Sequence, residues 1–377
     1  MRSCAMRALC NGKTLAFQAK DAGSIPAARS NLPCKWRYIV LMFNTRRSQL
    51  EKSAKRDRME GETSCLFVGS KGVMKLCETH QPLPNDFAKR WPRAALKTHQ
   101  AGGRIYVHVT AVKHFARWAL PKIESPFVLV TGDADPSVSA EVVGEKVLKK
   151  ILSHPHLIHW HAQNLAYAHP KLTPMAIGLD YHTIAGNRRP EWGPSASARA
   201  QEEVLHLVRA LSPNLSQRRV QGYCNWHFAI GNGDRAEVVK ALPEASCYYE
   251  PDQVARTASW RRNSGFFFTM SPRGVGMDCH RTWEAILLGS VPVIPVLPIN
   301  SLFDDLPVVI VQDWETVTPA FLAAERERIL DSEFDFAPML LETWRRVLFG
   351  REDLPSLRMR YQDFMAMGAE DLGAVIA

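Results

Sequence analysis

One segment of this 377-residue chain, residues 266–296, constrains the fold more than any other. An apolar run, Phe266–Met270, precedes a loop that contains Gly274 and Gly276, and a second apolar run, Val291–Val296, follows a polar-headed stretch. Glycine lets a backbone turn sharply and approach a ligand closely. A helix that begins after such a loop directs free N–H groups and the positive end of its dipole at the loop. The order strand, loop, helix, strand therefore predicts a phosphate-binding loop.

The sequence also indicates where this helix begins and ends. Asp278 is a favourable N-cap residue, and we predict a helix from about Cys279 to Leu288. Gly289 is suited to end this helix, and Pro292 prevents its continuation.

The helix start is rich in groups that suit a nucleoside diphosphate. Arg273, His280 and Arg281 offer positive or proton-donating groups to a pyrophosphate, and Glu284 offers a carboxylate to the ribose hydroxyls. Arg235, which follows a glycine-rich stretch, is a further candidate for phosphate contact or a surface residue. The alternative is a capped amphipathic helix in which Arg281 and Glu284 pair with each other.

Residues 271–289 resemble the nucleotide-sugar-binding signature of exostosin-type glycosyltransferases, that is, glycosyltransferase family 47 and its relatives. The resemblance is closest to the C-terminal domain of the ribitol-phosphate xylosyltransferase group and extends over much of residues 120–330. The chain departs from the family pattern at Val275, where Asn is usual, and at Ile286, where Leu is usual. The change at Val275 puts one polar contact of the loop in doubt.

The resemblance implies two Rossmann-like domains facing a cleft, the GT-B architecture. It also implies a nucleotide-sugar donor, expected to be UDP-linked, a glycan or other hydroxyl acceptor, and inversion at the anomeric carbon. No metal cofactor is required if arginines and the helix dipole stabilise the leaving diphosphate.

Short apolar runs recur between helix-like segments, and this alternation independently predicts an α/β fold. The predicted strands are Phe127–Thr131, Leu157–Trp160, Met175–Leu179, Phe266–Met270, Val291–Val296 and Val308–Val311. Helical spacing covers Ala140–Leu152 and Ser197–Leu211. With 46% hydrophobic residues the chain is long enough for two domains, which we place at residues 61–200, on the acceptor side, and 201–377, on the donor side.

Two carboxylates follow a predicted strand in the N-terminal half. Asp133 and Asp135 are candidates for the general base that takes a proton from the acceptor hydroxyl. The same Asp-x-Asp spacing is found at the metal site of single-domain, GT-A-type transferases, and a divalent cation bound there is the rival interpretation.

Several other polar residues are weaker candidates. His161 is a candidate catalytic residue, and Trp160 beside it could contact an acceptor sugar; His159 and His161 would share one face of a strand, so a metal site is an alternative. His169 and residues 180–182 follow strand ends without an assigned role. Arg256, Arg261 and Arg262 are expected on a solvated helix face.

The net charge of +9 is concentrated at one end of the chain. Residues 1–60 contain 13 Lys+Arg and 4 Asp+Glu, whereas the remainder contains 34 of each. We therefore expect a neutral folded body that does not bind nucleic acid, and a basic leader that is disordered, transit-like or spurious. Met59 and Met74 are candidate starts for the folded part.

No apolar run reaches the ~18–20 residues that a membrane-spanning helix needs. The eight cysteines have no C-x-x-C spacing, which disfavours a zinc site and is compatible with a reducing compartment. We expect a cytoplasmic or otherwise soluble glycosyltransferase. The alternatives are a metal-dependent transferase that uses Asp133 and Asp135, or a non-catalytic protein that binds nucleotide sugars or glycans.

Overall fold

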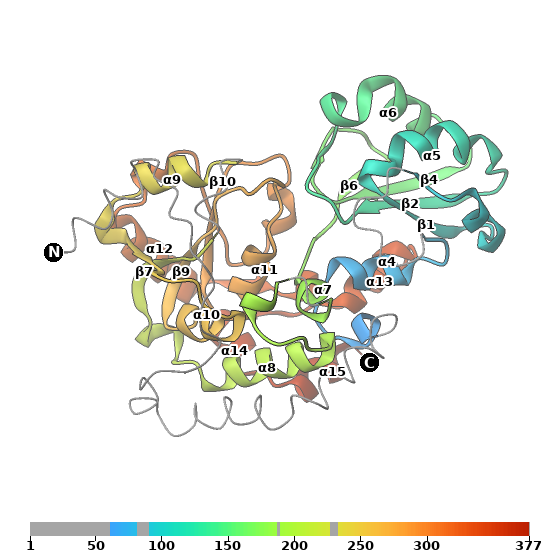
Figure 1. Cartoon of the computed structure of the whole chain (residues 1–377). Coiled ribbons are helices and arrows are strands. Elements are labelled where there is room, and N and C mark those ends of the chain that lie inside the picture. Colours follow the sequence, from blue (N-terminus) through green and yellow to red (C-terminus); the bar gives the residue numbers. More distant parts are fainter. Residues whose placement is uncertain (1–60, 81–89, 187–188, 227–232, 377) are drawn as a thin grey trace. The chain divides into compact units, whose positions relative to one another are not determined.

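The computed structural model describes residues 61–80, 90–186, 189–226 and 233–376 (Figure 1). These residues belong to the second of the two units into which the chain divides, Arg46–Ala377. The predicted leader, residues 1–60, lies outside the described residues.

The first sheet has four strands, all paired in parallel, in the order β1-β2-β4-β6. Its strands are β1 (Gly103–His108), β2 (Phe127–Gly132), β4 (Leu157–Ala162) and β6 (Leu172–Pro174). Helices α5 (Val112–Trp118) and α6 (Glu145–Leu152) lie on one side of this sheet, and α4 (Ser70–Leu76) lies on the other (Figure 1). A short parallel pair, β3 (Val138–Ser139) with β5 (Leu165–Ala166), lies outside the sheet.

The second sheet has five parallel strands in the order β11-β10-β9-β7-β8. Its strands are β7 (Arg219–Cys224), β8 (Cys247–Tyr249), β9 (Phe266–Met270), β10 (Val291–Pro295) and β11 (Val309–Val311). Its helices are α8 (Ala198–Leu211), α9 (Arg235–Ala241), α10 (Arg256–Asn263), α11 (His280–Leu287) and α12 (Pro319–Asp331).

The strand order of this second sheet reverses at one point. The chain passes from β7 to its outer neighbour β8, and then returns to the opposite side of β7 with β9. Connections that leave β7 and β9 therefore diverge at their carboxyl ends. In open α/β sheets such a reversal is where ligands bind.

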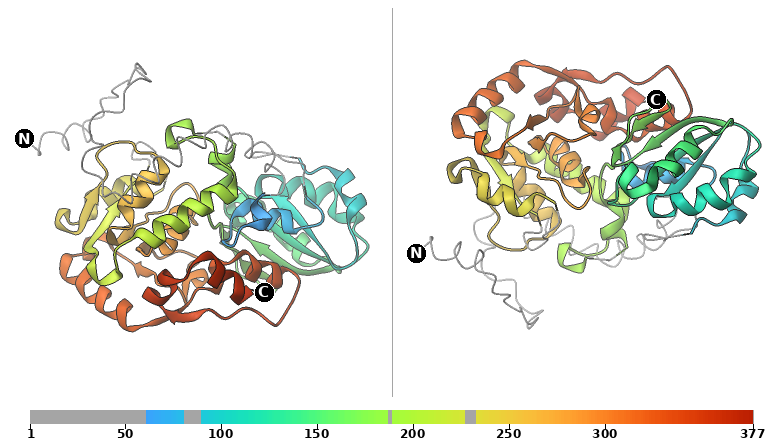
Figure 2. Two further views of the ribbon diagram at one scale, coloured as in Figure 1. Left: turned by 90° about the horizontal axis from the view of Figure 1, so that it is seen from below. Right: turned by 90° about the horizontal axis from the view of Figure 1, so that it is seen from above.

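The C-terminal segment returns to the beginning of the described chain. It contains β12 (Glu333–Asp335) paired antiparallel with β13 (Arg358–Arg360), and helices α13 (Leu341–Leu348), α14 (Tyr361–Ala366) and α15 (Ala369–Ile376). Phe67 pairs with Leu340 in an isolated bridge, and α13 packs on α4. Helix α14 packs on α8, and the C-terminal helices lie beside α8 in both views of Figure 2.

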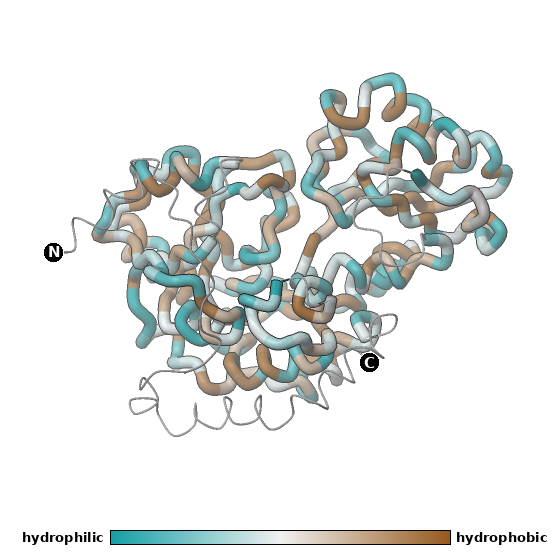
Figure 3. Tube along the Cα trace, in the orientation of Figure 1, coloured by the Kyte–Doolittle hydropathy of each residue, from teal (hydrophilic) through white to brown (hydrophobic). Residues whose placement is uncertain are grey.

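Apolar side chains supply the interior of both sheets. All six residues of β2 and all five of β9 are buried. Hydrophobic and hydrophilic residues alternate along the helices of the chain trace in Figure 3, as expected for helices that are covered on one face. Within the described part of the chain, no helix combines the length and the apolar character needed to cross a membrane.

The structure confirms the predicted α/β fold with two parallel sheets. It also confirms the helix beginning after Ser197, whose hydroxyl caps α8 by accepting from Ala200 N at 3.2 Å. The predicted strand at Met175–Leu179 is wrong. This segment is a connection whose backbone groups bond to other parts of the chain, for example from Leu179 N to Val68 O at 2.8 Å.

Two boundaries need correction. The proposed domain boundary at residue 200 falls inside α8. Met74 is not a suitable start for the folded part, because Phe67 and Val73 are fully buried and Lys71 forms an ion pair with Asp133. Residues 61–73 are part of the core.

This arrangement predicts different outcomes for two truncations. A chain that starts at Met59 should melt cooperatively at the temperature of the full chain. A chain that starts at Met74 should fail to fold, because each large buried side chain that is lost costs about 3–5 kcal/mol and total stability is about 5–15 kcal/mol. Thermal melting followed by circular dichroism tests this, and equal melting of both chains would contradict it.

Candidate functional site

The candidate site lies at the reversal point of the second sheet, between the connections that follow β7 and β9. We call residues 271–279, which join β9 to α11, the signature loop. Gly233, in the connection after β7, has a φ of 83°, and a Cβ there would overlap the carbonyl groups of Arg273 and Gly274. The two connections are thus in direct backbone contact, and this contact requires glycine.

Arg281 in the first turn of α11 points back at the signature loop. Its Nη2 donates to Pro272 O at 2.9 Å, and its guanidinium lies 5.7 Å from the ring centre of Trp226. Its Nε is buried and has no hydrogen-bond partner in the described part of the chain. A buried N–H group without an acceptor is costly, so this atom requires an explanation.

Arg235 at the start of α9 reaches the same loop from the other connection. Its Nη2 lies 2.8 Å from the position that a Cβ of Gly274 would take. Its Nε and Nη1 are also buried without a partner among the described residues. Burial and the neighbouring charge of Arg281 lower the pKa of Arg235 below its ordinary value. Two guanidinium groups at one glycine loop could together hold an anion.

Arg273 differs from these two arginines. Its Nε donates to Asp234 Oδ1 at 2.9 Å, and its side chain is about half exposed. It already has an anionic partner, so a phosphate contact would require it to exchange Asp234 for the ligand.

Asp278 does not have the predicted role. The N-cap of α11 is Cys279, which makes no side-chain capping bond. Asp278 is buried; its Oδ2 accepts from Ile177 N at 2.8 Å and its Oδ1 accepts from Trp283 Nε1 at 2.7 Å. Burial raises its pKa to about 6, although these two donors favour the charged form. Asp278 therefore fastens the helix start to the chain that follows β6, and it does not face a phosphate.

Asn164, which the sequence analysis missed, completes this junction. Its Oδ1 accepts from Asp278 N at 2.8 Å, and its Nδ2 donates to Ala134 O at 3.0 Å. It adopts a φ of 51°, which is uncommon for a residue other than glycine. It lies four residues after the predicted strand Leu157–Trp160, and the sequence carried no stronger signal for it.

The glycines of the signature loop are explained by the lack of room for a side chain and not by an unusual backbone conformation. Neither Gly274 nor Gly276 adopts a positive φ. A Cβ at Gly276 would lie 3.1 Å from Asn164 Nδ2 and 3.3 Å from the Cα of Asp135. Close packing against the N-terminal half explains this glycine. Gly289, by contrast, ends α11 with a φ of 72°, as predicted.

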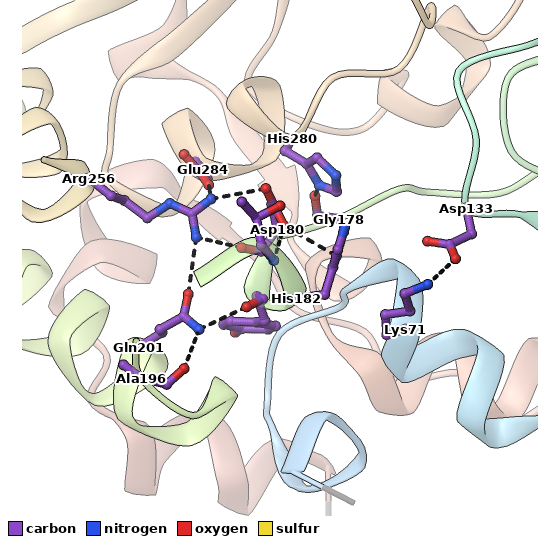
Figure 4. A network of polar contacts seen from close by, with 12 residues as sticks. Lys71, Asp133, Gly178, Asp180, His182, Ala196, Gln201, Arg256, His280 and Glu284 are labelled. Atoms are coloured by element: carbon purple, nitrogen blue, oxygen red, sulfur yellow. Dashed lines mark hydrogen bonds and ion pairs between the residues drawn. The ribbon is translucent and has the colours of Figure 1, made fainter. Parts of the chain in front are cut away.

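Glu284 is part of a polar network and does not form the pair with Arg281 that the alternative interpretation proposed (Figure 4). Its Oε2 accepts from Trp260 Nε1 at 3.0 Å, and its Oε1 lies 3.5 Å from Arg256 Nη2. Arg256 also donates to Gln201 Oε1 at 3.0 Å. The expectation that Arg256 lies on a solvated helix face is therefore wrong, because it is largely buried among these partners.

Asp180 links this network to α7 (Tyr181–Ala185) (Figure 4). Its Oδ1 caps the helix by accepting from Thr183 N at 3.0 Å and lies 3.2 Å from His182 Nδ1, and its Oδ2 lies 3.3 Å from Arg256 Nη2. Burial alone would raise the pKa of Asp180, but the neighbouring His182, His280 and Arg256 lower it well below its ordinary value.

His280, the first residue of α11, faces the same segment. Its Nδ1 lies 2.7 Å from Gly178 O, to which it donates, and its ring centre lies 5.9 Å from that of His182. One ring nitrogen, Nε2, is therefore left for a ligand. Residues 177–182 thus run along the start of α11, although the sequence placed them only at a strand end.

The two candidate carboxylates have different surroundings. Asp133 has a φ of 64° and forms an ion pair with Lys71 in which both side chains are only 6% exposed (Figure 4). Asp135 is exposed, and it is close enough to Arg235 for its charge to raise the pKa of that guanidinium group. An ion-paired Asp133 and an exposed Asp135 are not preorganised as a joint metal site.

His161 lies inside the first sheet and not at the signature loop. It is buried, its Nδ1 lies 2.9 Å from Thr173 Oγ1, and burial lowers its pKa to about 3. It is therefore a weak base. Trp160 is fully buried and donates to Thr131 Oγ1, so it is not available to an acceptor sugar. His159 and His161 do share a face, with ring centres 4.7 Å apart.

The described residues are 61–80, 90–186, 189–226 and 233–376. In these ranges no three His, Cys, Asp or Glu side chains are grouped so that they could hold a metal ion.

Comparisons with known proteins give distant similarity only. No protein-family model matches the sequence, and no curated protein matches it. Among solved structures, α,α-trehalose-6-phosphate synthase from Burkholderia multivorans is 12% identical, with a TM-score of 0.33 over 75% of this chain and 74% of that chain. The spinosyn rhamnosyltransferase SpnG is 13% identical, with a TM-score of 0.33 over 88% and 82% of the two chains. Similarity this distant does not identify a family, so the exostosin-type resemblance remains a prediction.

The packing of Gly276 generates a first prediction for this site. Gly276→Val should displace Asn164 and the signature loop and weaken binding of UDP at least tenfold, about 1.4 kcal/mol, while the sheets stay folded. Calorimetric titration with UDP measures the effect. Gly373→Val is the matched control, because a Cβ at Gly373 meets no atom within 4 Å. Normal UDP binding by Gly276→Val would contradict the prediction.

Glu62, a buried carboxyl group near Lys71 and Lys75, generates a pH prediction. Burial raises its pKa to about 7, although both lysines lower it. A raised native pKa stabilises the fold below the ordinary value of 4.5, and this stabilisation is lost as the pH rises through 7. Glu62→Gln should therefore gain unfolding free energy relative to the unmodified chain between pH 5 and pH 8, by up to about 3 kcal/mol.

Denaturant unfolding at pH 5 and pH 8 measures this difference. Glu203→Gln, at an exposed position of α8, is the control and should show none. Equal pH dependence in both variants would show that Glu62 does not titrate in this range.

Proposed function

We propose that the protein is a glycosyltransferase that binds the diphosphate of a nucleotide sugar at the signature loop. The observation that carries this proposal is the pair Arg235 and Arg281, whose buried N–H atoms have no acceptor among the described residues. Two adjacent guanidinium groups repel each other and leave donors unsatisfied, so the site is complementary to a ligand with several anionic oxygens.

The position of the pair favours a nucleoside diphosphate over a free anion. The site lies at the strand reversal of a parallel sheet and beside the start of α11, where N–H groups and the helix dipole favour phosphate. Glu284 is 16% exposed and its two oxygens retain lone pairs, so it can still accept from ribose hydroxyls. A UDP-linked donor is the form we propose.

In the reaction we propose, an acceptor hydroxyl attacks the anomeric carbon and the bond to the diphosphate breaks. Arg235 and Arg281 stabilise the negative charge that develops on the leaving group. Their charge replaces that of a divalent cation, so the reaction is proposed to be metal-independent. Direct displacement inverts the anomeric centre. The acceptor is a glycan or another hydroxyl compound.

Incubation of the full chain with a panel of nucleotide sugars and glycan acceptors, with and without EDTA, tests this proposal. Transfer that survives EDTA is the expected result. Transfer that is lost in EDTA and restored by Mn²⁺ would favour the metal-dependent alternative. Calorimetric binding of UDP without transfer or donor hydrolysis would favour a non-catalytic binding protein.

The arginine pair generates a prediction that separates a binding role from a structural one. Arg235→Met and Arg281→Met should each weaken UDP binding by about 10–100-fold, or 1.4–2.7 kcal/mol. Each should lower the melting temperature of the ligand-free protein less than Arg209→Met does, because relief of the repulsion between the two guanidinium groups offsets the contacts that are lost, such as the bond from Arg281 to Pro272 O.

Arg209→Met provides the control. Arg209 is buried like the pair but donates to Leu287 O and Phe364 O, each at 2.7 Å, so its loss should lower the melting temperature. If Arg235→Met and Arg281→Met destabilise the protein as Arg209→Met does and bind UDP normally, the arginines are structural and the proposal fails.

A further inference from the structure

A histidine and a carboxylate that have no role in donor binding, His182 and Asp180, lie next to the signature loop. Asp180 accepts from Thr183 N and thereby fixes the start of α7, and His182 Nδ1 lies 3.2 Å from Asp180 Oδ1. Although the two atoms are close, they do not form a regular hydrogen bond, and Nδ1 has no other hydrogen-bond partner within the described ranges. Ligand-free sites often show such loose contacts, which tighten when substrate binds.

The position of His182 relative to the donor site is fixed by the backbone. Ile177 N donates to Asp278 of the signature loop, and Gly178 O accepts from His280. Four residues after Gly178, His182 lies with its ring centre 5.9 Å from that of His280 (Figure 4). An imidazole is therefore held beside the start of the same helix that is proposed to bind the diphosphate.

The other candidate bases are less suited to accept a proton. Asp133 already has a cationic partner, Lys71, with which it forms a buried ion pair. Asp135 is exposed and close to Arg235. His161 is buried within the first sheet and bonded to Thr173.

We infer that His182 is the general base of the reaction and that Asp180 is its positioning residue. This inference rests on the proposed function. The acceptor O–H bond breaks and its proton passes to His182 Nε2, while the acceptor oxygen forms a bond with the anomeric carbon. The bond between the anomeric carbon and the phosphate oxygen breaks, and the diphosphate leaves with the electron pair. Asp180 holds the Nδ1 proton and stabilises the imidazolium.

The charges around His182 determine the pH dependence. Burial, His280 and Lys71 lower its pKa, whereas Asp180 and Asp133 raise it, and the net pKa lies below the ordinary value. The imidazole is therefore neutral and able to accept a proton at pH 7. Activity should fall only as the pH drops below the usual histidine range. Removal of the charge on Asp180 removes a contribution that raises the pKa, so Asp180→Asn should move this acid limb to lower pH.

The test compares kcat and KM of the full-length protein with those of His182→Gln, His182→Ala and Asp180→Asn. His182→Gln should lose about 10²–10⁴-fold in kcat while UDP binding by calorimetry changes little. Added imidazole should partly restore His182→Ala, and the acid limb of Asp180→Asn should shift as stated. His156→Gln is the matched control, since His156 precedes β4 and its ring faces that of His154 at 5.8 Å.

Each outcome is decisive. If the unmodified protein transfers sugar and His182→Gln retains its kcat, this inference fails while the proposed function stands. The inference also fails if kcat falls without rescue by imidazole and without a shift of the acid limb in Asp180→Asn, because His182 is then structural. If the unmodified protein transfers no sugar from any donor, the proposed function fails and this inference fails with it. Melting temperatures show whether each variant is folded. If His182→Gln does not fold, rescue of His182→Ala by imidazole decides whether His182 is the base.

Discussion

The buried carboxylate of Asp278 is the interaction on which the site depends. It accepts from the backbone of Ile177 and from the indole of Trp283, and its own N–H donates to Asn164. Asp278 therefore joins the signature loop to two distant pieces of chain: Ile177 is 101 residues away in sequence, and Asn164 is 114 residues away. A carboxylate without these donors would not stay buried, since an unpaired buried charge costs several kcal/mol. The signature loop is consequently held from both halves of the fold.

The opposite end of α11 is fixed just as firmly. Arg209 donates to Leu287 O and Arg218 donates to Leu288 O and Gly289 O, which satisfies carbonyl groups that a helix end leaves without partners. Cations at this end also complement the negative end of the helix dipole. With both ends anchored, the first turn of α11 cannot retreat from the loop. The unsatisfied N–H groups of Arg281 and Arg235 are therefore held at the loop by the fold itself, at a cost that a bound anion would offset.

The sequence predicted the local features and missed the long-range ones. Runs such as Phe266–Met270 became buried parallel strands because β-type apolar residues bounded by turn signals have few alternatives. Arg235 was predicted as a candidate for phosphate contact from its position after a glycine-rich stretch, and the structure places it at the signature loop. Asp278 was assigned as an N-cap because the cap rule uses neighbouring residues only, whereas its actual donors, Ile177 and Trp283, include one from 101 residues away. Asn164 and Lys71 were missed for the same reason, since their partners are set by tertiary packing.

Under the proposed function, the short segment from Ile177 to His182 would connect donor binding to proton transfer. Gly178 has a φ of 64°, and a Cβ there would overlap the carbonyl of Val68, so this turn is packed against the first described residues. Ile177 is bonded to the signature loop, and His182 is five residues further along the chain. Under the proposed function, Asp278 and His182 would thus be coupled through the bond from Ile177 N to Asp278 and the five residues of chain that follow it. A base carried on this segment would respond to donor binding, whereas a base within the first sheet, such as His161, would not.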